Sequence, residues 1–222
     1  MSTRREVNLA ILSTAAAAAT ATVGTKVLAQ SAAPVDLPPA NTAGGKPLMQ
    51  ALKNRRTIRH YSDRPLSNQD LSNLLWAAWG VNRPQQDGRT APRWRGAYLL
   101  DIYLVRADGV WLYEPKAHRL AFHMAGDLRG QTTTGQPFVA TAPLDLVYAV
   151  DASKMPDASE AEKNATAGAT AGLTAQNVYL YCASAGLATV LRESVPAGLA
   201  KTLQLPSGRI VQFAQSVGHP KA

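Results

Sequence analysis

Residues 159–186 read SEAEKNATAGATAGLTAQNVYLYCASAG, and this stretch predicts one long helix. It contains no proline, and Leu173, Gln176, Leu180 and Ala183 recur at three- and four-residue steps, which is the helical period. Its first half, residues 165–172, carries small residues almost everywhere. Another helix or a flat ligand can therefore approach the backbone closely there, although alanine also favours helices on its own account.

Around this helix the sequence changes to strand patterns. Strands are predicted at residues 101–105, 110–113, 144–150 and 209–217, with a hairpin between the first two that turns at residues 107–109. Two short helices precede them. Leu48 and Leu52 mark the first, and the run from Leu71 to Ala78, capped by Ser67, marks the second. Because helices and strands do not alternate regularly, the expected fold class is α+β, with a central antiparallel or mixed sheet flanked by helices.

The composition suits one globular domain. The chain has 222 residues, of which 46% are hydrophobic and 17% charged. Its formal net charge of +8 is compatible with a phosphate-bearing ligand, nucleic acid or an anionic membrane, and does not choose between them. Cys182 is the only cysteine, which excludes an intramolecular disulfide and a cysteine-based zinc site. The histidines lack metal-ligand spacing, so no metal site is predicted, and GxSxG, P-loop and GxGxxG motifs are absent.

The first 29 residues have the three-part order of an export signal. Arg4 and Arg5 open a charged start, residues 9–21 are weakly apolar, and Val27-Leu28-Ala29 offers a small-x-small cleavage site. The paired arginines are similar to the twin-arginine signal, which predicts a periplasmic or otherwise exported protein. An ordinary secretory signal and an uncleaved anchor are the alternatives. We expect residues 30–46 to form a linker or an extended arm and residues 47–222 to form the folded domain.

A short basic segment follows the first predicted helix. Arg55-Arg56-Thr57-Ile58-Arg59 places three guanidinium groups and one hydroxyl within five residues. The planar fork of an arginine can donate two parallel hydrogen bonds to a phosphate. From spacing alone, a solvated basic face is the alternative. A nucleic-acid patch has less support because no aromatic residues interleave with the arginines in a recognised motif.

Five stretches resemble the nitroreductase family, and they occur in its order. Residues 48–61 (LMQALKNRRTIRHY) resemble its opening, in which a helix ends in Arg-Arg-Ser/Thr-x-Arg before an aromatic residue. Residues 71–80 (LSNLLWAAWG) are similar to its second helix, residues 101–105 to its first core strand, and residues 176–190 (QNVYLYCASAGLATV) to its central helix and the turn beyond. Gly218-His219-Pro220-Lys221 resembles its terminal Gly-Tyr-Pro-Lys. The resemblance covers roughly residues 47–221.

The resemblance implies an intertwined homodimer with one FMN in each of two sites at the subunit interface. It implies that Arg55, Arg56 and Thr57 hold the phosphate and the ribityl chain. Arg59 is then expected to approach the pyrimidine edge of the flavin ring, and Lys221 to make a second positive contact with the phosphate.

A further segment is implied to lie beside the flavin ring. The backbone of Val190, Leu191 and Arg192 is expected near N5 and O4 of the isoalloxazine. Donors at these positions stabilise the negative charge that a reduced flavin develops.

The pattern fails after Thr90-Ala91-Pro92. There the family continues with a Ser and, a few residues later, an Asn and a Gln that bind the flavin and the chain around it; in this alignment Gly96 and Tyr98 replace the Asn and the Gln. Glycine offers no side chain, so at least one hydrogen bond to the cofactor is missing. Arg93 or Arg95 can substitute, and Trp94 is expected either to stack on a ring or to pack against its own core.

The predicted function is therefore an FMN-dependent oxidoreductase that transfers hydride in a ping-pong cycle between a donor and a small organic acceptor. Residues 131–143 are similar to the SagB-type branch, which is related to the peptide-azoline dehydrogenases, so the direction of the reaction stays open. A non-catalytic flavin or small-molecule binding protein on the same scaffold is one alternative. A basic surface-binding module is another, and it predicts ligand affinity that falls steeply with salt.

Overall fold

The computed structural model describes residues 32–221, and the predicted export signal at residues 1–29 lies outside the described residues. The helices are α1 (Leu48–Asn54), α2 (Asn68–Trp79), α3 (Glu160–Ala185) and α4 (Leu199–Thr202). The strands are β1 (Val35–Asp36), β2 (Val81–Arg83), β3 (Gly88–Arg89), β4 (Leu100–Arg106), β5 (Gly109–Glu114), β6 (Arg119–Met124), β7 (Leu144–Asp151), β8 (Ala188–Arg192) and β9 (Arg209–Gly218). Short 3-10 turns are η1 (Pro84–Gln86), η2 (Arg129–Thr132), η3 (Pro137–Thr141) and η4 (Ala152–Lys154).

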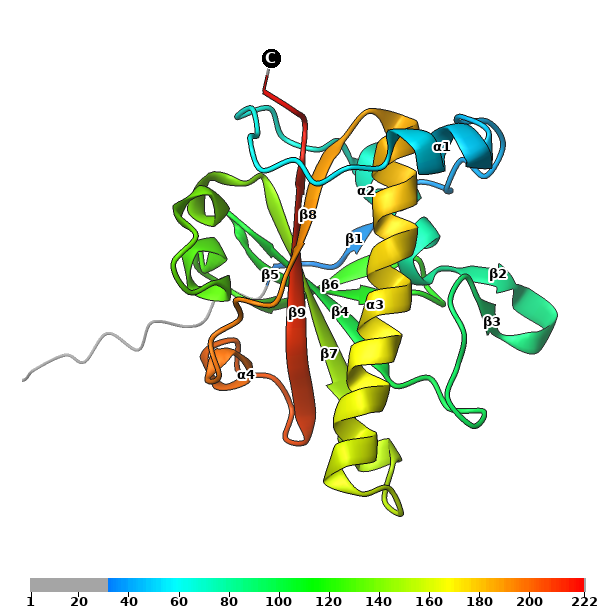
Figure 1. The fold of residues 1–222 in the computed structure, drawn as a ribbon, viewed down its shortest axis with the longest axis vertical. Coiled ribbons are helices and arrows are strands. Elements are labelled where there is room, and N and C mark those ends of the chain that lie inside the picture. Colours follow the sequence, from blue (N-terminus) through cyan, green and yellow to red (C-terminus); the bar gives the residue numbers. More distant parts are fainter. Residues whose placement is uncertain (1–31, 222) are drawn as a thin grey trace, which may run out of the picture.

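One large antiparallel sheet organises the fold. Its strand order is β1-β6-β5-β4-β7-β9-β8, and β2 and β3 form a separate small ribbon. Every residue of β7 is buried, as expected for a strand near the middle of the sheet with both faces covered. Figure 1 shows the long helix α3 lying across one face of this sheet. The α+β class with an antiparallel sheet is confirmed.

The predicted hairpin is present. Arg106 pairs with Gly109, so β4 and β5 are joined by two residues, Ala107 and Asp108. Gly109 has φ +138°, and a Cβ built on it comes within 2.7 Å of the carbonyl oxygen of Met124 on β6. A glycine is therefore required where β5 leaves the turn and meets the next strand.

The long helix α3 begins and ends as its sequence predicts. The side chain of Ser159 accepts the backbone N–H of Glu162 at its start, and Gly186 ends it in the left-handed region with φ +74°. Its buried side chains are Ala167, Ala171, Thr174, Ala175, Val178 and Cys182. Because most of them are small, α3 packs closely against β7, β8 and β9. Of the small residues in its first half, Ala167 and Ala171 are buried within the chain.

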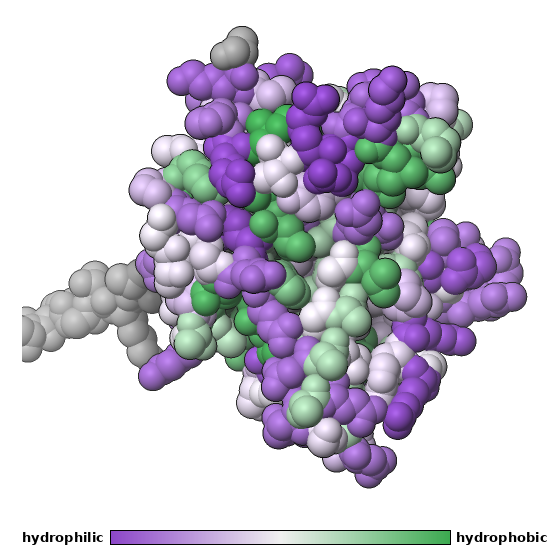
Figure 2. Space-filling model, viewed as in Figure 1, coloured by the Kyte–Doolittle hydropathy of each residue, from purple (hydrophilic) through white to green (hydrophobic). Residues whose placement is uncertain are grey.

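The two short helices differ in how they are covered. In α2, the Ser67 hydroxyl accepts the Asp70 N–H while the Asp70 carboxylate accepts the Ser67 N–H, which forms a complete capping box. In α1, Leu48 is 63% exposed and Met49 is 74% exposed, and only Ala51 is buried. Figure 2 shows hydrophobic side chains gathered on the surface over α1. This chain alone therefore leaves the apolar face of α1 uncovered.

The segment before α1 runs as an extended arm along the far edge of the sheet. Val35 and Asp36 pair with β6, and Leu37 is buried in the main core. His118 fixes this region, because its ring nitrogens lie 2.8 Å from the Ser72 hydroxyl and 2.9 Å from the Tyr113 hydroxyl. Burial lowers the pKa of His118, which keeps the ring neutral at pH 7.

A second, smaller core lies on the sheet face opposite α3. It contains Tyr103, Val105, Val110 and Val147 from the sheet together with Leu199 and Leu203 from the α4 region. Within residues 32–221, no helix combines the length and the apolar character needed to cross a bilayer.

Candidate functional site

Three segments that are distant in sequence meet at one end of the sheet. The Ile58 N–H donates to the Thr189 carbonyl oxygen at 3.0 Å, which places the basic segment 55–59 along the free edge of β8. The C-terminal residues join them: the Lys221 N–H donates to the His60 carbonyl at 3.1 Å, and the Ser62 N–H donates to the His219 carbonyl at 2.9 Å. Figure 1 shows these segments converging at the end of the sheet where the C-terminus lies.

Gly218 makes this convergence possible. A Cβ at this position lies 2.6 Å from the Pro143 Cδ atom and 3.0 Å from the ring of Tyr61, so any larger residue forces the segments apart. The Tyr61 hydroxyl donates to the Ile58 carbonyl at 3.1 Å. Burial raises the pKa of Tyr61, so its hydroxyl stays protonated and keeps this donor role at neutral pH.

The site carries positive charge without a counter-charge. Among residues 32–221, Arg55, Arg56, Arg59 and Lys221 form no ion pair with a carboxylate. Arg55 is half-buried, and the other three are exposed. Most other arginines of the described chain are paired with Asp or Glu, so the structure leaves this cluster available to an anionic ligand.

Tyr179 on α3 contacts this cluster. The Arg55 guanidinium lies 5.2 Å from the centroid of its ring. The Tyr179 hydroxyl lies 3.1 Å from the Thr57 Oγ1 atom and accepts the Leu191 N–H at 2.9 Å.

A pocket of about 310 Å³ opens beside the cluster, within the size range of small-molecule sites. It is lined by Lys46, Asn54, Arg56, Ile58, Tyr179 and Thr189, among others. The Lys46 Nζ atom donates to the Ala183 carbonyl at 3.3 Å, close to the negative end of the α3 dipole. Arg56 borders this pocket directly, and Arg55 and Thr57 contact Tyr179, which lines the same pocket.

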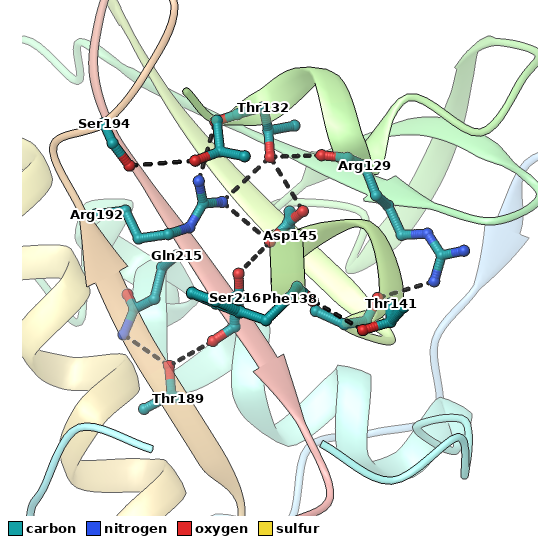
Figure 3. A network of polar contacts seen from close by, with 12 residues as sticks. Arg129, Thr132, Phe138, Thr141, Asp145, Thr189, Arg192, Ser194, Gln215 and Ser216 are labelled. Carbon is teal, nitrogen blue, oxygen red and sulfur yellow. Dashed lines mark hydrogen bonds and ion pairs between the residues drawn. The ribbon is translucent and has the colours of Figure 1, made fainter. Parts of the chain in front are cut away.

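Behind β8 lies a buried polar network, shown in Figure 3. The Arg192 guanidinium donates to Asp145 Oδ1 at 3.1 Å and to the Thr132 carbonyl at 3.0 Å. The Ser216 hydroxyl donates to the same carboxylate, and the Thr132 hydroxyl donates to its other oxygen at 3.1 Å. The side chains of Arg192 and Asp145 are 1% and 0% exposed.

Burial dominates the electrostatics of this network. It raises the pKa of Asp145 to about 6, because loss of solvation outweighs the nearby Arg192 charge and the hydrogen bonds that favour the ionised form. Burial likewise lowers the pKa of Arg192. With its side chain held by Asp145, Arg192 can serve a ligand only through its backbone, which is the role that the sequence resemblance implies for it. Val190 is buried, and Leu191 is half-buried on the same edge strand.

The segment that departs from the family pattern forms a tight turn. The Trp94 N–H donates to the Ala97 carbonyl at 3.1 Å, and the Ala97 N–H donates back to Trp94 at 2.7 Å. The two residues between them, Arg95 and Gly96, have φ +42° and +86°. Turns with two positive φ angles favour glycine at the second position, so Gly96 has a conformational role of its own.

The side chains of this turn are engaged within the chain. Arg95 forms an ion pair with Glu162 at 3.0 Å, and Trp94 packs against the main core. The Tyr98 hydroxyl donates to the Asp87 carbonyl at 2.6 Å, and its ring packs edge-on against Trp79. Neither Arg95 nor Tyr98 is therefore directed to the basic cluster of this chain.

Arg93 lies away from the cluster within one chain. It lines a small pocket with Trp94 and with Thr166 and Thr170 on the first half of α3. The basic cluster contacts the other half, near Tyr179 and Ala183. At 1.5 Å per residue, Thr170 and Ala183 are separated by about 20 Å along the helix axis. The structure therefore brings the basic segment, strand β8 and the C-terminal lysine together and leaves Arg93 outside this group.

Two residues near the site, Asp145 and Tyr179, were not predicted because the sequence pattern marks them only weakly. Asp145 is a charged residue inside an otherwise apolar strand, and such a residue is buried only when it is paired. Tyr179 is one of several large residues in the second half of α3, and nothing in the helical period separates it from core residues. Cys182, on the same helix, is fully buried, and burial raises the pKa of its thiol. Together these features define an α+β protein with an unpaired cationic site at the edge of its sheet.

Comparison with known proteins agrees with this definition. Residues 52–219 match the nitroreductase family. A Methanocaldococcus jannaschii protein assigned to the nitroreductases is 32% identical over 152 residues, which cover 64% of this chain and 76% of that protein. A crystal structure from Ralstonia eutropha, also assigned to the nitroreductases, has a TM-score of 0.80 at 36% identity and covers 88% of this chain and 96% of its own. The NADPH:FMN oxidoreductase of Vibrio harveyi, complexed with NAD+, has a TM-score of 0.59 at 21% identity over 79% of this chain and 69% of its own. The chain belongs to the nitroreductase family.

Proposed function

We propose that this protein is an FMN-dependent oxidoreductase that transfers electron pairs between a donor and a small organic acceptor. The observation that carries the proposal is a group of cations, Arg55, Arg59 and Lys221, next to the Thr57 hydroxyl and the edge of β8. Within residues 32–221 these cations have no carboxylate partner. Membership of the nitroreductase family and the likeness to a Vibrio harveyi oxidoreductase named for FMN support it.

The residues present fit the phosphate end of FMN. A phosphate monoester carries close to two negative charges at neutral pH, and arginine forks and hydroxyl groups are its usual partners. Arg55, Arg56 and Thr57 would hold the phosphate and the ribityl chain, and Lys221 would add a further positive charge. Arg59 would hold the pyrimidine edge of the ring. The Leu191 N–H on β8 donates to the Tyr179 hydroxyl at 2.9 Å, so the edge strand is tied to the same segment through Tyr179.

When bound, FMN supplies hydride transfer at its ring, so the protein needs no catalytic acid or base of its own. The chain's residues then bind and orient the cofactor, and fixed donors near the ring stabilise its reduced form. We propose two half-reactions in which donor and acceptor react in turn at the same face of the flavin.

The direct test is the absorption spectrum of the purified protein. We expect the bands of bound oxidised flavin, bleached by dithionite, and FMN as the molecule released on denaturation. After the flavin is removed, FMN titration should give a dissociation constant that rises at least about tenfold in Arg55→Gln and again in Arg59→Gln, because a hydrogen bond to a charged group is worth about 1.5–3 kcal/mol.

Arg64→Gln is the matched control, since Arg64 is exposed and follows the cluster by five residues. It should bind FMN like the wild type. A folded protein that stays colourless after reconstitution with FMN, or variants at Arg55 and Arg59 that bind FMN normally, would refute the proposal.

We further propose that the working unit is a homodimer whose sites lie between two copies. Leu48, Met49 and Leu52 on α1 and Leu173 on α3 are large apolar residues that this chain leaves exposed. Leu173 lines a pocket with Arg93, so a second copy that covers Leu173 would also lie against the Arg93 turn. Light scattering should give twice the monomer mass, and Leu48→Ser with Met49→Ser should shift the protein toward monomer.

A non-catalytic flavin-binding protein is the second candidate. The observation that favours it is the turn at residues 94–97, where Gly96 presents no side chain and Arg95 is held by Glu162. Both candidates predict a yellow protein. Turnover of reduced flavin with quinone or nitroaromatic acceptors separates them, because a binding protein would reoxidise no faster than through its reaction with oxygen.

We also propose that the protein is exported, on the strength of Arg4, Arg5 and the small-x-small site that ends at Ala29. Nicotinamide cofactors are cytoplasmic, so an exported enzyme would use another reductant or would oxidise its substrate, as the likeness of residues 131–143 to the azoline-dehydrogenase branch suggests. Cell fractionation tests this. The wild type should be found outside the cytoplasm, and a variant with both Arg4→Lys and Arg5→Lys should be retained inside.

A further inference from the structure

Tyr179 contacts three of the groups that the proposed function assigns to the cofactor. Its ring lies beneath the Arg55 guanidinium, 5.2 Å from the centroid, and its hydroxyl lies 3.1 Å from the Thr57 Oγ1 atom. The same hydroxyl accepts the Leu191 N–H at 2.9 Å. Through one side chain, α3 is therefore connected both to the basic segment and to the edge of β8.

The anchor of this side chain is rigid. Val178 precedes Tyr179 on α3 and Cys182 follows it by three residues; both are fully buried, so packing holds this part of the helix against the sheet. Tyr179 itself is half-buried and lines the pocket that Arg56 and Thr189 also border. A phenylalanine would fill the same space, so packing alone does not require the Tyr179 hydroxyl.

The hydrogen bonds of the Tyr179 hydroxyl indicate a role in orienting Thr57. A phenol has one proton to donate and can accept hydrogen bonds through its oxygen. Because the oxygen already accepts from Leu191, its proton is free to go to the Thr57 Oγ1 atom. Thr57 then accepts from Tyr179, which leaves its own proton to be donated to another acceptor.

We propose that Tyr179 is a positioning residue that orients Thr57 as a hydrogen-bond donor to the phosphate of the flavin and holds Arg55 beside it. This inference rests on the proposed function, because it assumes that the phosphate binds at Arg55 and Thr57. It assigns to Tyr179 a share in the selection of FMN over a flavin that lacks the phosphate.

The test compares Tyr179→Phe with Tyr181→Phe in the full chain. Tyr181 lies two residues further along α3, is also half-buried, and faces Asn73 and the N-terminal arm. We expect Tyr179→Phe to weaken FMN binding about tenfold, the weight of one charge-assisted hydrogen bond, with riboflavin binding unchanged. Tyr181→Phe should bind both flavins like the wild type.

Thr57→Val completes the design, because Thr57 is exposed and its replacement does not disturb the core. Thr57→Val alone should reproduce the loss of FMN affinity. Added to Thr57→Val, the Tyr179→Phe change should cause no further loss of FMN affinity, since the hydroxyl it orients is already gone.

The possible failures are distinguishable. If the wild type binds neither flavin, the proposed function itself fails. If the wild type binds FMN but Tyr179→Phe binds FMN as tightly or more tightly, or loses FMN and riboflavin equally, the positioning role is wrong while the proposed function stands. The same holds if Thr57→Val binds FMN normally, which also decides the matter should Tyr179→Phe fail to fold.

Discussion

Removing one member of the buried Arg192–Asp145 pair should destabilise the protein severely, and removing both should not. Asp145→Asn leaves the Arg192 guanidinium charged, 1% exposed and without a carboxylate. Breaking a buried pair in this way costs about 3–5 kcal/mol, because the remaining charge is neither solvated nor paired. At pH 7.5, loss of the buried Asp145 charge offsets part of this cost, because burial disfavours the ionised carboxylate. Adding Arg192→Met to Asp145→Asn removes that charge, and we expect the double variant to regain at least about 2 kcal/mol relative to the sum of the single changes.

Urea-induced unfolding at pH 7.5, followed by tryptophan fluorescence, gives the free energies of unfolding for the four proteins of this cycle. The slope of free energy against urea should be the same in all four, which shows that the same surface is exposed on unfolding. A loss below about 1 kcal/mol in Asp145→Asn, or a double variant as unstable as the sum of its parts, would refute the reasoning.

The change of the free energy of unfolding with pH is a separate test of the same pair. Burial raises the pKa of folded Asp145 to about 6, above the value of about 3.9 expected in the unfolded chain. The stability contributed by this group is therefore complete below the unfolded pKa and is lost as the pH rises through about 6. Between those values the wild type should lose up to about 1.4 kcal/mol per pH unit relative to Asp145→Asn. A gain of stability with pH over this interval would show that Arg192 outweighs burial.

Substitutions at Gly96, Ser67 and Gly218 test three local features of the fold. Gly96→Val should lower the free energy of unfolding by about 1–2 kcal/mol in urea titrations because φ at this position is +86°, and Gly96→Asn should cost less because asparagine tolerates the left-handed region. Ser67→Ala should remove the capping box of α2 and lower the free energy of unfolding by about 1 kcal/mol, while the exposed Ser207→Ala should not. Gly218→Ala should weaken FMN binding more than it lowers the melting temperature, because its Cβ pushes the Pro143 and Tyr61 region away from the C-terminal segment.

Much of the fold was determined locally and could be predicted from the sequence. The helix α3 follows from a proline-free helical period between Ser159 and Gly186, and both ends are set by side-chain or backbone preferences of single residues. The β4–β5 hairpin follows from two strand patterns separated by Ala107-Asp108, and the start of α2 follows from the Ser67–Asp70 spacing. These signals act over a few residues, so a single sequence contains them.

The candidate site was predicted less completely. The basic segment and the C-terminal lysine were expected to lie together, and the structure brings their backbones into hydrogen-bonding contact at His60 and Lys221. Their roles toward FMN remain predictions. Strand β8 was expected only as a turn beyond the helix, because its five residues have no alternating pattern that separates them from a loop.

The sequence by itself determined helices α1, α2 and α3, the β4–β5 hairpin and the high density of cations at residues 55–59. Only the tertiary structure decided that Tyr179 would contact Arg55, Thr57 and Leu191, that Arg192 would be buried against Asp145, and that Arg93 would lie some distance from the other arginines. The physical reason is that the hydrogen bonds among these residues join positions 12 to 122 residues apart and depend on how α3 packs on the sheet. Packing of small residues fixes that arrangement without leaving a periodic signal in the sequence.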